Sequence, residues 1–201
     1  MSQLKLTADS GGGTVAIKAP TSTTGNAALD LTVPGTASAT LDTLGRAGNI
    51  LQVKQSVKTD TATTTSTNTF VDTGLSVSIT PSSASNKILV IANLSFSAGD
   101  RQNIAWRLVR DSTDLYLGDA ASNRTRASGA VRVADHQDAE HQNCTSVFLD
   151  SPNTTSATTY KVMWCRTYST YAIFMNRAYE DTDNDDRTRV PSSITVQEVA
   201  A

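Results

Sequence analysis

Residues 74–96 read GLSVSITPSSASNKILVIANLSF, and this stretch holds two different strand patterns on either side of a turn. From 75 to 79, Leu, Val and Ile alternate with Ser, which predicts a half-buried strand that Pro81 ends. From 88 to 92 every residue is apolar. A run that is apolar on both faces predicts a central strand of a sheet. The stretch therefore favours a β-fold with a buried sheet interior.

Similar signals recur along the chain on both sides of this stretch. No segment shows the spacing of an amphipathic helix. About eight strands separated by turn-rich segments predict an all-β fold, an antiparallel β-sandwich that is jelly-roll-like. Further strands are expected at residues 50–57, 104–109, 146–149, 160–166, 172–175 and 194–199, with a weak strand at 131–133 and a hairpin that turns at 111–114 and returns through 115–117.

The first third of the chain has a different composition. The first aromatic residue is Phe70, and the residues before it are mostly small, with few charges. Such a segment buries too little apolar surface to offset its ordering entropy. Short alternating runs at 14–18 and 28–33 are β-competent but too short to fold alone. We expect residues 1–48 to be an extended β/loop attachment arm that neighbouring subunits order; a disordered tail is the alternative.

These patterns divide the chain into three parts. Residues 1–48 form the attachment arm. Residues 49–68 form a first strand followed by a Thr-rich linker, because the run from 59 to 69 is nearly all Thr, Ser and Ala. Residues 69–201 form the β-sandwich head.

The bulk composition disfavours several partners. The net charge of −2 and the pI of about 5.6 argue against a general nucleic-acid binder, which would be basic. No apolar run is long enough to span a membrane, and the N-terminus lacks the features of a signal peptide. We expect the chain to be made in a cytoplasm, where Cys144 and Cys165 are free thiols.

A zinc site is the first metal-binding possibility. His136, His141, Cys144 and Cys165 are the only histidines and cysteines of the chain. Imidazole and thiolate both suit zinc, but the two histidines are five residues apart and no Cys-x-x-Cys pair exists. We therefore predict no metal ligands among them.

The acidic run at 180–186 has some likeness to a calcium loop. Asp186 replaces the required Gly, the twelfth position is Ser192, and no helices are expected around it. We interpret the run as an acidic surface turn balanced by Arg187 and Arg189. A loose, non-helical divalent site remains the alternative.

Catalytic signatures are missing from the sequence. It contains neither a Gly-x-Ser-x-Gly motif nor a Gly-rich phosphate loop before a helix, and no carboxylate has a distinctive setting. We expect no enzyme activity, no catalytic residues and no cofactor. The one basic stretch, from Arg101 to Arg132, is expected to be a solvated loop paired with neighbouring aspartates, although it could contact an acidic partner.

The order of several segments resembles small virion proteins of tailed bacteriophages, especially those of cyanobacteria and marine bacteria. The likeness spans nearly the whole chain, and its motifs are structural rather than chemical. The matching segments are QLKLT (3–7), GGGTV (11–15), KAP (18–20), LTVPG (31–35), ILQV (50–53), DSP (150–152), TYKV (159–162) and SITVQE (193–198).

The resemblance implies a head decoration (cement) or head-fibre protein, a homotrimer with jelly-roll heads. The expected partners are then other copies of the chain and, through residues 1–48, the major capsid protein or another virion protein. The expected location is the virion, assembled in the host cytoplasm. The alternative is a tail-fibre adhesin whose loops 118–143 and 177–191 bind a host-surface glycan or protein. An enzyme acting on polysaccharide is a third, less favoured hypothesis.

Overall fold

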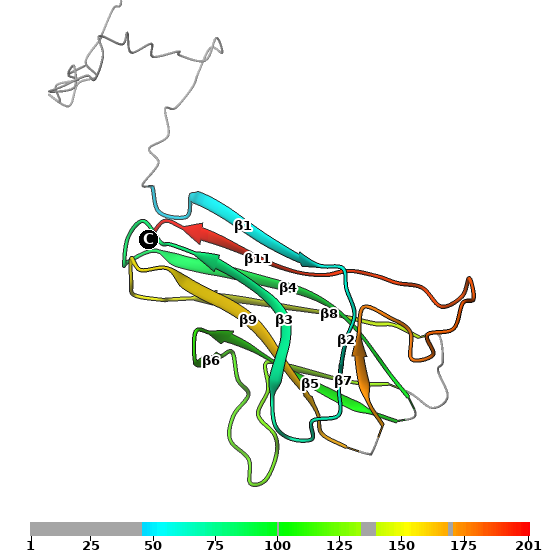
Figure 1. The fold of residues 1–201 in the computed structure, drawn as a ribbon. Helices are drawn as coiled ribbons and strands as arrows, with labels where there is room; N and C mark the ends of the chain where they lie inside the picture. Colours follow the sequence, from blue (N-terminus) through cyan, green and yellow to red (C-terminus); the bar gives the residue numbers. More distant parts are fainter. Residues whose placement is uncertain (1–45, 100, 134–139, 169–170) are drawn as a thin grey trace, which may run out of the picture. The chain divides into compact units, whose positions relative to one another are not determined.

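The computed structural model describes residues 46–99, 101–133, 140–168 and 171–201 (Figure 1). All regular structure in these residues is β, in two antiparallel sheets. The expected attachment arm, residues 1–48, lies outside the described residues except for 46–48.

The larger sheet contains six strands. Its order is β1-β11-β4, and β8 pairs with the other side of β4. β11 begins opposite Asn93 of β4, and past this point the short strand β10 pairs with Phe96–Ala98 along the same edge of β4. The short strand β2 in turn pairs with β10. The strands are β1 (Ile50–Lys58), β2 (Ala62–Thr64), β4 (Lys87–Ala98), β8 (Gln142–Asp150), β10 (Ile173–Met175) and β11 (Ser192–Val199).

The smaller sheet contains five strands in the order β3-β9-β5, after which β6 and β7 pair with opposite ends of β5. Near the start of β3 the pairing register with β9 shifts, and Gly74 takes a positive φ of 78° there. A residue with a side chain would be strained in that conformation. The strands are β3 (Val71–Ile79), β5 (Asn103–Arg110), β6 (Thr113–Leu115), β7 (Gly129–Arg132) and β9 (Thr158–Arg166).

The strand order is that of a jelly roll. The first strand, β1, pairs with the last, β11. Apart from the short β2, the next strands alternate between the two sheets: β3 in the smaller, β4 in the larger, β5 in the smaller. The result is the layer β1-β11-β4-β8 against the layer β3-β9-β5 with β6 and β7. The prediction of an all-β, antiparallel, jelly-roll-like sandwich is confirmed.

The core lies between the two sheets. Along β11 and β4 buried and partly exposed residues alternate, as the period of two requires. Three buried aromatic rings stand at the centre: Phe96 lies 5.5 Å from Trp106 and 5.7 Å from Trp164, measured between ring centroids. The indole nitrogen of Trp106 donates to Ser146 Oγ (2.9 Å), which links β5 of one sheet to β8 of the other.

The described strands extend the expected ones in two places. The Thr-rich run from 59 to 69, expected as a linker, contains β2, which pairs with β10. Residues 49–68 thus supply two strands of the larger sheet, and the sandwich starts at residue 50. The segment 118–143, expected as long loops with a weak strand at 131–133, contains β7 at about that place and, in addition, the start of β8. A short strand of Thr and Ala pairs through its backbone, so the sequence gives little sign of it.

Candidate functional site

The described chain begins beside its own C-terminus. Residues 46–49 form a turn in which Asn49 N donates to Arg46 O (3.0 Å), and Gly48 has a φ of 89°. Gly48 N then donates to Ala200 O and Ala200 N to Asn49 O, each at 2.9 Å. These bonds extend the β1–β11 ladder to the last residues of the chain (Figure 1). Residues 46–49 thus lead directly into the edge strand β1, beside Ala200.

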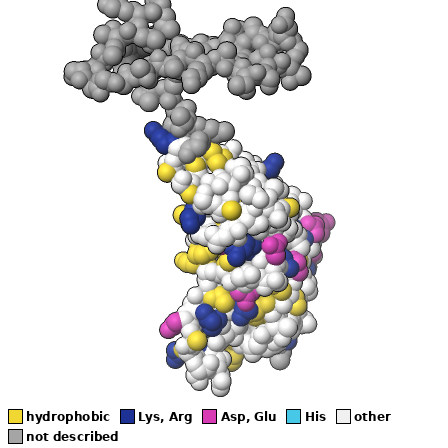
Figure 2. All heavy atoms as spheres, turned by 90° about the vertical axis from the view of Figure 1, so that its left-hand side faces the viewer, with side chains coloured by type: hydrophobic (Ala, Val, Ile, Leu, Met, Phe, Trp, Pro, Cys, Tyr) yellow, Lys and Arg dark blue, Asp and Glu magenta, His cyan; other side chains and the backbone are white. Residues whose placement is uncertain are grey.

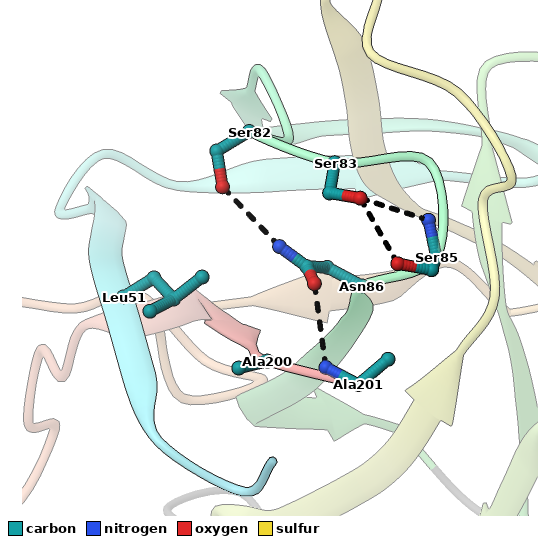
Figure 3. Close-up of a pocket in the computed structure, with 7 residues that line it drawn as sticks. All are labelled: Leu51, Ser82, Ser83, Ser85, Asn86, Ala200 and Ala201. Carbon is teal, nitrogen blue, oxygen red and sulfur yellow. Dashed lines mark hydrogen bonds between the residues drawn. The ribbon is translucent and has the colours of Figure 1, made fainter. Parts of the chain in front are cut away.

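A shallow pocket of about 340 Å³ lies at this junction (Figure 3). Ser83 Oγ lies 2.9 Å from Ser85 Oγ, and Ala201 N donates to Asn86 Oδ1 (3.3 Å). The wall is thus made of small side chains and hydroxyls that are already bonded to one another. Its lining residues are Leu51, Ser82, Ser83, Ser85, Asn86, Ala200 and Ala201.

The carboxylate of Glu198 on β11 is fully buried next to this pocket. Asn86 Nδ2 (2.6 Å), Ser82 N and Ser82 Oγ (both 2.7 Å) donate to its Oε1. Gln52 Nε2 donates to its Oε2 (2.5 Å) and also to Thr80 O (2.8 Å). The donors come from β1 and from the β3–β4 turn, so one carboxylate connects three parts of the chain.

The hydrogen bonds decide the ionisation of Glu198. Burial by itself raises the pKa of a carboxyl group, but donation from Asn86, Gln52 and Ser82 outweighs it and holds the pKa of Glu198 at about 2. The group is therefore a buried anion at neutral pH, stabilised by neutral donors. A carboxylate with so low a pKa is a poor general base, although the Ser82 hydroxyl bonds to it.

The sequence analysis did not single out Glu198. A signal for it was present, because the alternation over 194–199 places Glu198 on the same face as Ile194 and Val196. A glutamate on the buried face of a strand needs nearby donors. Which donors surround it depends on the pairing of β1 with β11.

The second hollow lies over the loop at 177–191, where arginines contact several of the carboxylates. Arg189 forms a two-pronged bond to Asp181 (2.6 and 2.7 Å), and Arg187 contacts both Asp186 (2.8 Å) and Glu180 (3.3 Å). Arg187 and Arg189 thus contact Glu180, Asp181 and Asp186, three of the five carboxylates of the acidic turn. The hollow measures about 350 Å³ and is lined by Asp181, Thr182, Asp183, Asn184, Arg187 and Arg189.

Of the four residues considered for zinc, the structure describes three, and it does not bring these three together. His136 lies outside the described residues. His141 has its Nδ1 3.2 Å from Ser95 Oγ and its Nε2 3.0 Å from Thr188 O. Cys144 on β8 and Cys165 on β9 belong to different sheets, and both are free thiols. Within the described ranges, no three His, Cys, Asp or Glu side chains are grouped to hold a metal ion.

The basic stretch does not form one surface. On the outside of the smaller sheet, Arg107 pairs with Asp114 (2.5 Å) and lies over the Phe70 ring. Arg110 instead bonds both oxygens of Asp150 (2.9 and 2.7 Å), which also accepts from Tyr160 Oη (2.7 Å). The expectation that Arg110 pairs with a neighbouring aspartate of its own stretch is therefore wrong, because the pairing crosses between the sheets.

Figure 2 shows one face of the molecule, on which Lys and Arg side chains are interspersed with Asp and Glu. No broad field of one sign appears on that face. This face therefore shows no basic stripe of the kind that nucleic-acid-binding surfaces carry. Among the residues that the structure describes, no helix is long and apolar enough to cross a lipid bilayer.

Comparisons with known proteins give no family. No family model matches the chain, and no curated protein matches it. One similar solved structure is that of infectious bursal disease virus, Gx strain, with 11% identity and a TM-score of 0.40, over 87% of this chain and 43% of that one. Another is a mutant VP2 protein of the same virus in derived T=1 particles, with 11% identity, a TM-score of 0.40 and coverages of 87% and 41%. The chain spans less than half the length of either.

Proposed function

We propose that this chain is a structural protein of a bacteriophage virion, a homotrimeric capsid decoration protein that is attached through residues 1–48. The role is assembly and not turnover. The resemblance of the segments from 3–7 to 193–198 to small virion proteins supports the class of protein. The composition of residues 1–48, which lack aromatic side chains, supports an arm that gains its order from a partner.

The network around Glu198 is the observation that carries the attachment. An arm that binds a shell transmits force to the strand that follows it. Here that strand is β1, whose Gln52 is held by Glu198 of β11, and Glu198 is held in turn by Ser82 and Asn86. A load on the arm is thus shared with β11 and the β3–β4 turn, so the edge strand is not the only support.

A structural role also agrees with the chemistry of the two hollows. The pocket beside β1 is lined by Ser, Asn, Ala and Leu, and the carboxylate next to it has a pKa of about 2. In the hollow at 177–191, Arg189 pairs with the carboxylate of Asp181, and Arg187 pairs with Asp186 and Glu180. Neither arrangement provides a base near neutral pH beside a nucleophile.

The test uses phage particles that lack this protein. Purified full-length chain is expected to sediment with such particles in tens to hundreds of copies. A chain of residues 46–201, which retains the whole described sandwich, is expected to remain folded by circular dichroism but to stay in the supernatant. Equal binding by the shortened chain would overturn attachment through residues 1–48.

The tail-fibre adhesin remains the second candidate, and the hollow at 177–191 favours it. Carboxylate, amide and guanidinium groups in a hollow of about 350 Å³ can hydrogen-bond the hydroxyls of a glycan. If the protein is an adhesin, it occurs as a few copies at the tail, and purified protein blocks adsorption to the host. Many copies on the head and unchanged adsorption would exclude it.

A further inference from the structure

The edges of the two sheets are the places where a further strand can pair. Among the described strands, six have a neighbour on one side only: β1, β2 and β8 in the larger sheet, and β3, β6 and β7 in the smaller one. An edge strand presents unpaired backbone N–H and C=O groups, and folded proteins usually protect it by shortness, a charged residue, a bulge or a proline. The six edges therefore need to be compared for such protection.

Five of these edges are protected. β1 carries Lys54 and Lys58 and has a register shift after Ile50, and β3 has the register shift near Gly74. β2 and β6 are only three residues long, and β7 is four residues long. Each of these strands is thus short, bulged or charged, and a poor template for a partner strand.

The edge of β8 has none of these protections. The strand is nine residues long and pairs with β4 over its whole length without a register shift, and residues 142–149 include no charged residue and no proline. Asp150, at its end, is buried and accepts from Arg110 and Tyr160. Within the described ranges, no backbone–backbone hydrogen bond outside the β4 ladder involves a residue of β8. β8 is thus a long, regular and open edge.

The side chains of β8 favour an apolar strand as the neighbour. Val147 and Leu149, on the side away from the core, are each 51% exposed. On the other side, the ring of Phe148 lies 5.4 Å from that of Tyr116, which is half exposed at the rim of the sandwich. A strand that paired with β8 would satisfy the open backbone groups and cover apolar surface at the same time.

We propose that residues 28–33 from the arm of a neighbouring copy pair with β8 as an added strand. Residues 28–33 lie outside the described residues, and their sequence is Ala-Leu-Asp-Leu-Thr-Val. The proposal rests on the self-association in the proposed function and names the surface that supports it. Residues 1–27 remain for the attachment to the shell.

The sequence favours 28–33 over the other alternating run of the arm. Leu29, Leu31 and Val33 recur at every second position, so all three fall on one side of an extended strand and can lie beside the exposed apolar residues of β8. The one charged residue of the run falls on the opposite side. The run at 14–18 has only two large apolar residues and ends in a lysine.

The chain between the run and β1 is long enough to reach another copy. Residues 34–49 number sixteen, and at about 3.3 Å per residue they extend up to roughly 53 Å. A domain of the size of this sandwich has a radius of gyration of roughly 15 Å. The arm can therefore leave its own sandwich and lie along the β8 edge of the next.

The symmetry of this contact agrees with a homotrimer. The arm of one copy and the β8 edge of the next are different surfaces, and a contact between different surfaces can close into a ring of three. Pairing of β8 with β8 of a second copy would instead give a two-fold dimer. The other edges of the described sandwich are protected, so they offer no equally open strand to pair with β8.

The first test measures the mass of the purified full-length chain by sedimentation velocity over a range of concentrations. Leu31→Pro and Thr32→Pro are tested separately, because N–H groups of successive residues point to opposite sides of a strand, so that one of the two faces β8. Ile17→Pro is the matched control in the other run of the arm. All three substitutions lie outside the described sandwich, whose fold is verified by circular dichroism.

The β8 edge is tested in the same way. Val147→Lys places an ammonium beside the added strand, and Val53→Lys is the matched control, because Val53 has the same exposure (52%, against 51%) on the protected edge β1. Thermal unfolding verifies that both variants are folded. A chain of residues 46–201, which lacks the run, is measured alongside.

Wild type, Ile17→Pro and Val53→Lys are expected to sediment as an integer multiple of the 21.3 kDa chain, three for a trimer. Val147→Lys and at least one of the two proline variants at 31 and 32 are expected to raise the dissociation constant at least tenfold, and residues 46–201 to be monomeric. A monomeric wild type, or association of residues 46–201 like that of wild type, would overturn the proposal. Unchanged association of Val147→Lys would do the same.

Disulfide trapping then identifies the copy that supplies the strand. Leu29→Cys, Leu31→Cys or Val33→Cys is placed in one chain and Val147→Cys in another, each with Cys144→Ala, and the two chains are mixed, allowed to exchange and oxidised. At least one of the three pairs is expected to form a disulfide between two different chains. Disulfides that form only when both cysteines are in one chain would overturn the proposal in favour of the chain's own arm. A disulfide between two copies of Val147→Cys would overturn it in favour of two-fold pairing.

Failure of this proposal can be distinguished from failure of the attachment in the proposed function. A chain that is monomeric, or whose residues 46–201 associate by themselves, but that sediments with particles through its arm contradicts the pairing with β8 and leaves the attachment standing. A chain that associates through β8 but binds no particle contradicts the attachment alone.

Discussion

Substitution of Glu198 by Gln should make the stability of the protein much less dependent on pH. The carboxylate has a folded pKa of about 2, against an ordinary value of 4.5. A carboxyl group with a depressed folded pKa stabilises the fold above its unfolded pKa. That contribution is lost as the pH falls toward the folded pKa. For Glu198 the window therefore runs from about pH 4.5 down to about pH 2.

The magnitude follows from the same two values. Their difference, 4.5 minus about 2, corresponds to about 3 kcal/mol at 1.36 kcal/mol per pKa unit. Glutamine resembles the protonated acid: its oxygen can still accept from Asn86 and Ser82, but its amide faces the Gln52 amide, a second donor. Glu198→Gln should thus lower the free energy of unfolding by about 3 kcal/mol at pH 7 and by little at pH 2.

The assay is urea unfolding at a series of pH values and one chain concentration, followed by the fluorescence of the buried Trp106 and Trp164. The other carboxyl groups titrate in both proteins, so the difference between the two curves isolates Glu198. Glu180→Gln is the control, since its salt bridge to Arg187 is exposed and should be worth less than about 1 kcal/mol. A difference that is the same at pH 3 and pH 7 would refute the reasoning.

Three further outcomes are expected. Gly129→Ala should destabilise the fold by roughly 1–3 kcal/mol in urea unfolding, because an added Cβ would lie 2.2 Å from the Trp106 ring. The control Gly118→Ala, whose added Cβ would have nothing within 4 Å, should change stability by less than about 0.5 kcal/mol. Equal effects of the two substitutions would contradict the packing around Trp106. Tyr160→Phe removes the hydroxyl that donates to Asp150 Oδ2 and should lower the free energy of unfolding, followed by thermal unfolding, by about 1–2 kcal/mol. An unchanged free energy would mean that this hydrogen bond between the sheets makes no net contribution to stability. Burial raises the pKa of both thiols, to about 11 for Cys165, where Arg107 only partly opposes it. Cys144 is partly exposed and Cys165 is fully buried, so a thiol reagent at pH 8 should modify Cys144 slowly in the native protein and Cys165 only after denaturation. Rapid native modification of both thiols would contradict the burial of Cys165.

The fold class could be predicted from the sequence because it depends on local patterns. Alternation at 75–79 and a continuous apolar run at 88–92 each specify which faces of a strand leave water, and these segments lie in β3 and in the first half of β4. The short strand β2 escaped prediction because it pairs through the backbone alone, which Thr and Ala side chains do not reveal.

The candidate sites depended on register, which local patterns do not contain. The sequence analysis found the acidic turn at 180–186 and its arginines, since these partners are neighbours in the chain. It missed the Glu198 network, in which Glu198 Oε2 and Gln52 Nε2 are brought together across 146 positions by the pairing of β1 with β11. The same holds for Arg110, whose partner Asp150 lies on the opposite sheet.

The sequence by itself determined that the chain folds as a β-sandwich and that its first third differs in composition, because burial periodicity and side-chain size are properties of single segments. Only the tertiary structure decided that Val53, Leu89 and Leu149 share a row with Gln197 on the side of the larger sheet that faces away from the core. A residue's place across a sheet is set by hydrogen bonds between strands far apart in the chain, and a shift of one residue would turn the row to the opposite side.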